Sequence, residues 1–263
     1  MVNFVNDCEI VNTATGTIAS LSGFDGNSAV YLSGDRNTLL NMGTIFSTNG
    51  IGVTMQGDDV ITNNSGMIQG YDIGVLARGI DYTILNSGTI ETGTYATSVG
   101  VLMAGNGTSK VLVNTGVIQS LSIGAGTAVQ VAGSNLTTID NSGTIRSVGG
   151  VAIDASTATG AIHLTNSGAI IGSNNTTYAV GGTELADTII NSGSINRSVA
   201  MLGGDDLFDG IGGFVGGTVF GGLGNSVSRT RWRRCSRMPD RACSTASKAP
   251  SAFRCSRPAR SRT

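Results

Sequence analysis

Proline, aromatic residues and charged residues are all scarce in this chain of 263 residues. It contains three prolines, 5% aromatic residues, 13% charged residues and one histidine. Intrinsic disorder goes with low hydrophobicity and high net charge, so a chain with 40% hydrophobic residues and a formal net charge of −1 is expected to fold. No apolar run approaches the about 18 residues that a membrane-spanning helix needs. The opening MVNFVNDCEI lacks the basic and long apolar segments of a secretory signal.

Glycine is abundant, with 40 residues, and charge is distributed unevenly along the chain. Residues 1–225 carry 16 acidic and five basic side chains, whereas residues 226–263 carry 11 basic side chains and one acidic. The second segment also holds all three prolines, the only tryptophan and three of the four cysteines. Two different kinds of sequence are therefore joined near position 225.

A short phrase, Asn-x-Gly-x-Ile, recurs seven times in the first segment, and a variant, ATGTI, ends at Ile18. The intervals between the asparagines run from 22 to 28 residues, which is typical of a solenoid. Between them, apolar residues alternate with threonine, serine and asparagine, the period-two pattern of β-strands. The asparagines of the phrase are Asn41, Asn64, Asn86, Asn114, Asn141, Asn166 and Asn191.

Each repeat has room for about three short strands, and helical periodicity is absent. Strands linked so tightly cannot form a βαβ sheet, but they can wind into a right-handed parallel β-helix with one coil per repeat, about eight coils in all. We predict an all-β fold in three parts. A β-helix covers residues 1–200, a glycine-rich β-roll-like end covers 201–225, and a disordered tail covers 226–263.

The phrase itself is interpreted as scaffold. Each asparagine is expected to take the left-handed backbone conformation at a sharp corner. Its side-chain amide is expected to bond to the asparagine of the next coil, which makes a ladder. The glycine avoids a Cβ clash at the corner, and the isoleucine points inward onto its copies.

Residues 201–225, MLGGDDLFDGIGGFVGGTVFGGLGN, depart from this phrase. GGDDLFDG resembles the glycine- and aspartate-rich nonapeptide of repeats-in-toxin (haemolysin-type calcium-binding) proteins, and FGGLGN resembles the start of a further copy. The resemblance implies calcium bound between the stacked coils of a parallel β-roll, and it assigns Asp205, Asp206 and Asp209 as ligands. The site would be incomplete, because Ser226 stands where the family continues with Asp. The alternative is a glycine-rich cap that binds no ion.

The tail is interpreted as the product of a shifted reading frame. With a suitable choice of codons, residues 235–248 read LENAGQGVLDSVK in another frame, which resembles the phrase that follows the calcium repeats in this family. Cys235, Cys243 and Cys255 would then be accidents of translation, and their spacing fits no common zinc site. The alternative is a basic tail for nucleic acid or a membrane surface.

One group of acidic residues is a candidate active site. Parallel β-helices often host polysaccharide lyases and epimerases, which need clustered carboxylates and a base. The candidate carboxylates are expected to line one edge, with Arg36 and Arg78 nearby, but a solvated column of turn residues is the preferred interpretation, because aspartate is favoured in turns. His163 is expected on the surface. The four candidates are Asp35, Asp58, Asp59 and Asp81.

The rod resembles the stalks of bacterial surface and secreted proteins, namely autotransporter passengers, haemagglutinin-like adhesins and repeats-in-toxin exoproteins. The resemblance implies a non-enzymatic adhesion or matrix protein, secreted or on the cell surface, with a polysaccharide or host surface as ligand and no nucleic-acid partner. Repeats-in-toxin proteins carry their export signal at the C-terminus, which this chain would have lost. The alternatives are a polysaccharide-modifying β-helix enzyme and a fragment of an autotransporter passenger.

Overall fold

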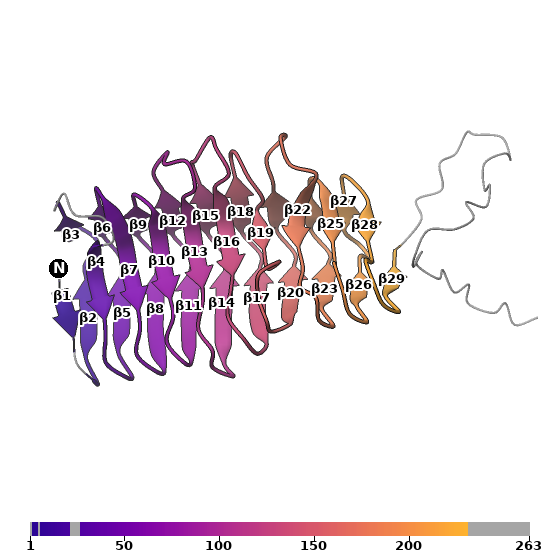
Figure 1. Ribbon diagram of the computed structural model, residues 1–263. Helices are drawn as coiled ribbons and strands as arrows, with labels where there is room; N and C mark the ends of the chain where they lie inside the picture. Colours follow the sequence, from indigo (N-terminus) through magenta and orange to yellow (C-terminus); the bar gives the residue numbers. More distant parts are fainter. Residues whose placement is uncertain (1, 5, 22–26, 231–263) are drawn as a thin grey trace, which may run out of the picture.

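The computed structural model describes residues 2–4, 6–21 and 27–230, and they wind as a right-handed parallel β-helix (Figure 1). Every coil passes through three sheets in turn, and all strand pairs within the sheets are parallel. The predicted all-β fold is confirmed. In the described part of the chain there is no helix, hence none long and apolar enough to span a membrane.

The first sheet has ten strands. They are β1 (Val2–Phe4), β4 (Asn27–Leu32), β7 (Gly50–Met55), β10 (Ile73–Ala77), β13 (Val99–Met103), β16 (Thr127–Val131), β19 (Ile153–Asp154), β22 (Tyr178–Gly181), β25 (Ser198–Ala200) and β28 (Val219–Phe220).

The second sheet also has ten strands and contains the repeated asparagines. They are β2 (Glu9–Asn12), β5 (Thr38–Asn41), β8 (Val60–Asn64), β11 (Tyr82–Asn86), β14 (Lys110–Asn114), β17 (Thr137–Asn141), β20 (Ile162–Asn166), β23 (Thr188–Asn191), β26 (Leu207–Asp209) and β29 (Val227–Arg229).

The third sheet has nine strands and contains the repeated isoleucines. They are β3 (Thr17–Ser20), β6 (Thr44–Ser47), β9 (Met67–Gly70), β12 (Thr89–Thr92), β15 (Val117–Ser120), β18 (Thr144–Ser147), β21 (Ala169–Ile171), β24 (Ser194–Ile195) and β27 (Phe214–Val215).

The core is a set of aliphatic columns that run along the helix axis. Ile90, Ile118 and Ile145 are register partners in neighbouring strands of the third sheet and have no exposed surface. Each such side chain stabilises the fold by about 1.5–3 kcal/mol relative to exposure. The predicted inward stacking of the isoleucines is therefore confirmed.

The asparagine ladder is continuous through eight coils. Each side-chain Nδ2 donates to Oδ1 of the next asparagine over 2.7–2.8 Å. Its other contacts are backbone carbonyls, as when Asn64 Nδ2 donates to the carbonyl of Thr89 over 3.1 Å. The ladder begins one coil earlier than the seven repeats indicate, because Asn12 donates to Asn41.

The expected left-handed backbone at these asparagines is wrong. Among the described residues, positive φ outside glycine occurs at Asp7, Arg36, Asp59, Asn135 and Leu202, and none of them belongs to the ladder. Each ladder asparagine instead ends an extended strand of the second sheet. In the six asparagines from Asn41 to Asn166 the carbonyl accepts two N–H groups of the next coil, as Asn41 does from Ser65 (2.8 Å) and Gly66 (3.0 Å).

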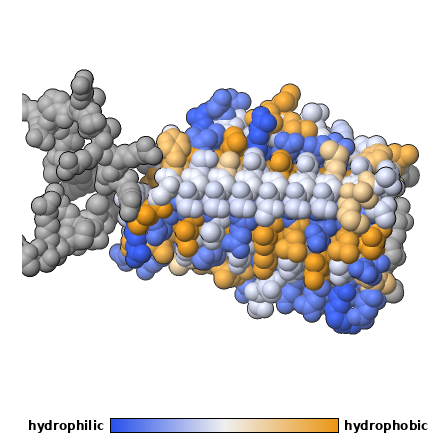
Figure 2. Space-filling view, turned by 180° about the vertical axis from the view of Figure 1, so that it is seen from behind, coloured by the Kyte–Doolittle hydropathy of each residue, from blue (hydrophilic) through white to orange (hydrophobic). Residues whose placement is uncertain are grey.

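The glycine of the repeat is required by the closeness of the neighbouring coil. A Cβ atom at Gly66 would lie 2.1 Å from the carbonyl oxygen of Gly43, well inside van der Waals contact. The following repeats show the same approach, and the expected avoidance of a Cβ clash is confirmed. On the opposite side from Figure 1, a straight band of intermediate hydropathy runs along the axis, which reflects the regular stacking of similar residues (Figure 2).

The three sheets continue beyond residue 200, where a change of architecture was expected. Phe208 is the register partner of Ile189 and is fully buried, and Val215 follows Ile195 in the third sheet. Strand β29 then pairs with β26, so the tail does not begin at residue 226 as expected. Apolar side chains still fill the inward positions after the Asn-x-Gly-x-Ile phrase has ended, and this keeps the coils stacked. Residues 231–263, with Cys235, Cys243 and Cys255, lie outside the described residues.

The ladder makes a prediction about stability. Replacing Asn141 by Ala leaves Asn114 Nδ2 and Asn166 Oδ1 without their amide partners in the buried interior. The free energy of unfolding should fall by about 1–3 kcal/mol, measured by urea denaturation followed by circular dichroism. Ser142→Ala, at the exposed next residue, is the matched control. Equal stability of the two variants would contradict a stabilising ladder.

Candidate functional site

The candidate carboxylates lie where the chain turns from the first sheet to the second. Asp35, Asp58 and Asp81 occupy this corner in successive coils, so the predicted placement along one edge is confirmed. Each accepts a backbone N–H from the next coil. Asp35 Oδ1 accepts from Asp58 (3.0 Å), Asp58 Oδ1 from Ile80 (3.0 Å), and Asp81 Oδ1 from Ser109 (2.7 Å). These carboxylates therefore bridge neighbouring coils.

Of the two basic residues expected near the carboxylates, Arg36 lies at the same corner, where its backbone N–H donates to the carbonyl of Asp58 over 2.8 Å. Arg36 forms a two-pronged ion pair with Asp7 of the preceding coil, with both N–O distances at 2.7 Å. This contact raises the pKa of Arg36 and lowers the pKa of the Asp7 carboxyl group. Arg36 and Asp59 both have positive φ, of 52° and 53°, so the left-handed turn conformation occurs at this corner. Arg78 is exposed.

The sole histidine lies on the outer side of the second sheet. His163 is the register partner of Thr138 and Thr188, and its side chain is half-buried between the neighbouring coils. The expected outward position is confirmed.

The predicted calcium ligands lie in one coil but point to different partners. Asp205 Oδ1 accepts the backbone N–H of Asn225 (2.8 Å), and Asp209 Oδ1 accepts that of Ile211 (3.0 Å). Asp206 points into the interior, where it accepts the N–H of Asp187 (2.9 Å) and the hydroxyl of Ser226 (3.2 Å). Within the part of the chain that the structure describes, no three His, Cys, Asp or Glu residues gather closely enough to hold a metal ion. In this structure the three carboxyl groups are therefore engaged with separate hydrogen-bond partners.

Two buried carboxylates follow one another at the end of the rod. Asp187 is 1% exposed and accepts hydrogen bonds from Ile162 N (2.8 Å) and from the N–H (2.6 Å) and hydroxyl (2.9 Å) of Thr183. Asp206, one coil later, is 2% exposed. Burial raises the pKa of both carboxyl groups, that of Asp206 to about 6. The two groups contribute a pH-dependent element to the stability of the last coils.

The sequence interpretation missed a third buried charge. Lys110 begins β14 and is 1% exposed, in an inward column between Tyr82 and Thr137. Its Nζ donates to the backbone carbonyls of Gly105 (3.3 Å), Ser134 and Asn135 (3.1 Å), and burial lowers its pKa. The sequence did contain a signal for this buried charge, because the alternation of apolar and polar residues places Lys110 at an inward position. The ammonium group thus has three carbonyl acceptors, and its bonds to Ser134 and Asn135 hold the turn of the next coil in place.

Comparison with known proteins gave no match: no protein-family model, no curated protein and no solved structure matches this chain. The resemblance to surface and secreted repeat proteins therefore rests on the repeated phrase and on residues 201–225.

The buried Asp206 predicts an unusual dependence of stability on pH. Its pKa is about 6 in the folded chain and near 3.9 when unfolded, so the folded state holds more protons between these values. Its contribution is complete below about pH 4 and is lost as pH rises through about 6, by no more than about 3 kcal/mol. Asp187 shifts in the same direction.

Thermal melting of the wild type and Asp206→Asn between pH 4 and 8 tests this. The variant should lose part of the pH dependence and gain stability at pH 7, because the amide carries no charge to bury. Asp209→Asn, in the same coil, is the control. A wild type whose stability rises steadily from pH 4 to pH 7, and a variant that behaves identically, would contradict the assignment.

Proposed function

We propose that this chain is a non-enzymatic repeat protein of the bacterial cell surface or extracellular space, of the adhesion or matrix type. The proposal rests on the hydrogen bonds that the candidate carboxylates form. Asp35, Asp58 and Asp81 each bind the backbone of the next coil, which is a scaffold role. A catalytic acid or base instead needs its carboxyl group in reach of the proton that it transfers to or from a substrate.

The construction of the rod supports the same proposal. A continuous amide ladder and stacked isoleucines hold the coils in one register, while the corner loops differ in length from coil to coil. A rigid element that presents variable loops suits binding to an extended surface or polymer. A polysaccharide lyase or epimerase, and an autotransporter passenger fragment, are the alternatives.

Calcium enters this proposal as a weak ligand at most. Asp205, Asp206 and Asp209 each already accept a backbone hydrogen bond, and Asp206 points inward. Titration calorimetry of the full chain with Ca²⁺ should give a dissociation constant of about 10⁻⁴–10⁻³ M or weaker. Asp205→Asn is the matched variant, and Mg²⁺ is the control ion. Submicromolar binding of Ca²⁺ that this variant abolishes would show that the carboxylates rearrange to form a complete site.

The proposed function is tested by separating binding from turnover. The full chain is incubated with acidic and neutral polysaccharides, and both retention on the immobilised polymer and release of shortened or unsaturated products are measured. We expect retention without products. Asp58→Asn is the diagnostic variant, because an enzyme that used this carboxylate would lose product formation while it kept its fold. Product release by the wild type that this variant loses would replace the proposal with the lyase or epimerase alternative.

A further inference from the structure

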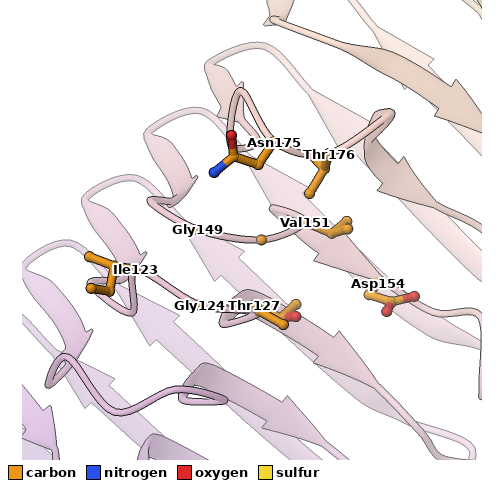
Figure 3. A pocket seen from close by; sticks show the side chains of 10 residues that line it. Ile123, Gly124, Thr127, Gly149, Val151, Asp154, Asn175 and Thr176 are labelled. Carbon is orange, nitrogen blue, oxygen red and sulfur yellow. The ribbon is translucent and has the colours of Figure 1, made fainter.

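A hollow lies at the corner where the chain passes from the third sheet to the first. It has a volume of about 470 Å³, within the range of small-molecule sites. Ile123 stands on one side, Asn175 and Thr176 stand on the other, and the backbone of Gly149 lies between them, with Thr127 and Asp154 on the strands below (Figure 3). We call this feature the glycine hollow.

The hollow exists because the loop at one corner, residues 148–152, is shorter than the loops beside it, residues 121–126 and 172–177. The turn at Gly149 and Gly150 has no side chains, and a Cβ atom on either residue would lie 2.1 Å from a carbonyl of the preceding coil. The next loop, which carries Asn175 and Thr176, is held beside this turn by the hydrogen bond from Ser173 N to Gly150 O (2.9 Å). The walls are therefore fixed to the coil stack.

A pair of tyrosines extends the feature along the same corner. Tyr71 and Tyr95 belong to successive coils, with ring centroids 5.5 Å apart and exposures of 38% and 48%. Ala125 N donates to Ala96 O over 2.9 Å, which places the loop of Ile123 beside the loop of Tyr95. Ile123 is 79% exposed. Tyr95, Ile123, the hollow and Asn175 thus follow one another over three coil steps, about 14 Å.

The chemistry of this strip selects a class of ligand. Asp154 is the only charged side chain among the ten residues that line the hollow, and its Oδ1 accepts the N–H of Ser156. A carboxylate, an amide and hydroxyl groups, with no basic side chain among the lining residues, disfavour an anion and suit the hydroxyl groups of a neutral ligand. The exposed tyrosine rings and Ile123 offer apolar surface, on which the CH face of a sugar ring can pack.

We propose that the tyrosine pair and the glycine hollow form one binding strip that contacts several consecutive sugar rings of a neutral polysaccharide. The inference rests on the proposed function as a binding protein and names its ligand class and its site. In this arrangement Asp154 and Asn175 hold hydroxyl groups at one end. Tyr71, Tyr95 and Ile123 support the chain at the other. A long ligand gains affinity because it contacts successive coils, and the rod does not have to change its structure.

The test uses the full chain and neutral oligosaccharides of increasing length, namely xylo-, cello-, manno- and malto-oligosaccharides, with polygalacturonate as the acidic comparison. Binding is measured by titration calorimetry, and the melting temperature of each variant reports its fold. At least one neutral series should bind with an affinity that rises over the first few sugar rings. Asp154→Asn should weaken binding about tenfold, because a charged acceptor is lost. Ala125→Trp, at an exposed lining residue, should abolish binding by filling the hollow.

Tyr95→Ala separates the two ends of the strip. It should weaken binding of long oligosaccharides by about five- to tenfold and leave the shortest binding oligomer unchanged. Asp140→Asn on the outer side of the second sheet and Leu136→Ala, where the leucine is 49% exposed, are the controls and should bind as the wild type does.

Failure of this inference can be told apart from failure of the proposed function. If a neutral saccharide binds and none of Asp154→Asn, Ala125→Trp and Tyr95→Ala weakens it, the strip is wrong and the binding function stands. If only polygalacturonate binds, or no saccharide in the set binds, the neutral-polysaccharide site is wrong. Release of cleaved or unsaturated products overturns the proposed function itself.

Discussion

The rest of the rod depends on one hydrogen bond, from the side-chain amide of each ladder asparagine to the amide oxygen of the next. An amide buried without a partner costs free energy, so the coils from Asn12 to Asn191 all place an asparagine at this position. A slip of one residue would turn the asparagine outward and expose the isoleucine four residues later. The bond from Asn114 to Asn141, for example, fixes the same register in which Ile118 stacks on Ile145.

The sequence was sufficient to predict the fold because this register demands the same residues in every coil. The sequence was insufficient where residues outside the repeated phrase keep the coils in the same register. In the first coil, two extra residues separate Asn12 from its glycine, so this asparagine does not match the repeated phrase. After residue 200 the phrase ends, yet Phe208 takes the inward place of Ile189 and the sheets continue. The backbone of the asparagines was mispredicted, because the bend lies in the two residues after them.

For the candidate sites, the sequence predicted the position of side chains and missed their partners. Counting residues along the repeat placed Asp35, Asp58 and Asp81 on one edge, because they precede the ladder asparagines of their coils by six, six and five residues. Their partners are backbone N–H groups of the next coil, whose direction depends on the turn conformation. The glycine hollow has no motif at all. It arises from the difference in size between a two-glycine turn and the loops beside it, which only the folded chain reveals.

The ladder therefore fixes the stacking of the coils, while the corner loops vary in length. Intervals of 22 to 29 residues separate the ladder asparagines, yet the ladder bonds differ by no more than 0.1 Å, from 2.7 to 2.8 Å. Loop length at the corner between the third and first sheets can thus vary without disturbing the stack. Tyr71, Tyr95 and Ile123 are carried by such loops and are fixed by the coils beneath them. A ligand that meets these side chains finds them already ordered, so little conformational entropy is lost on binding.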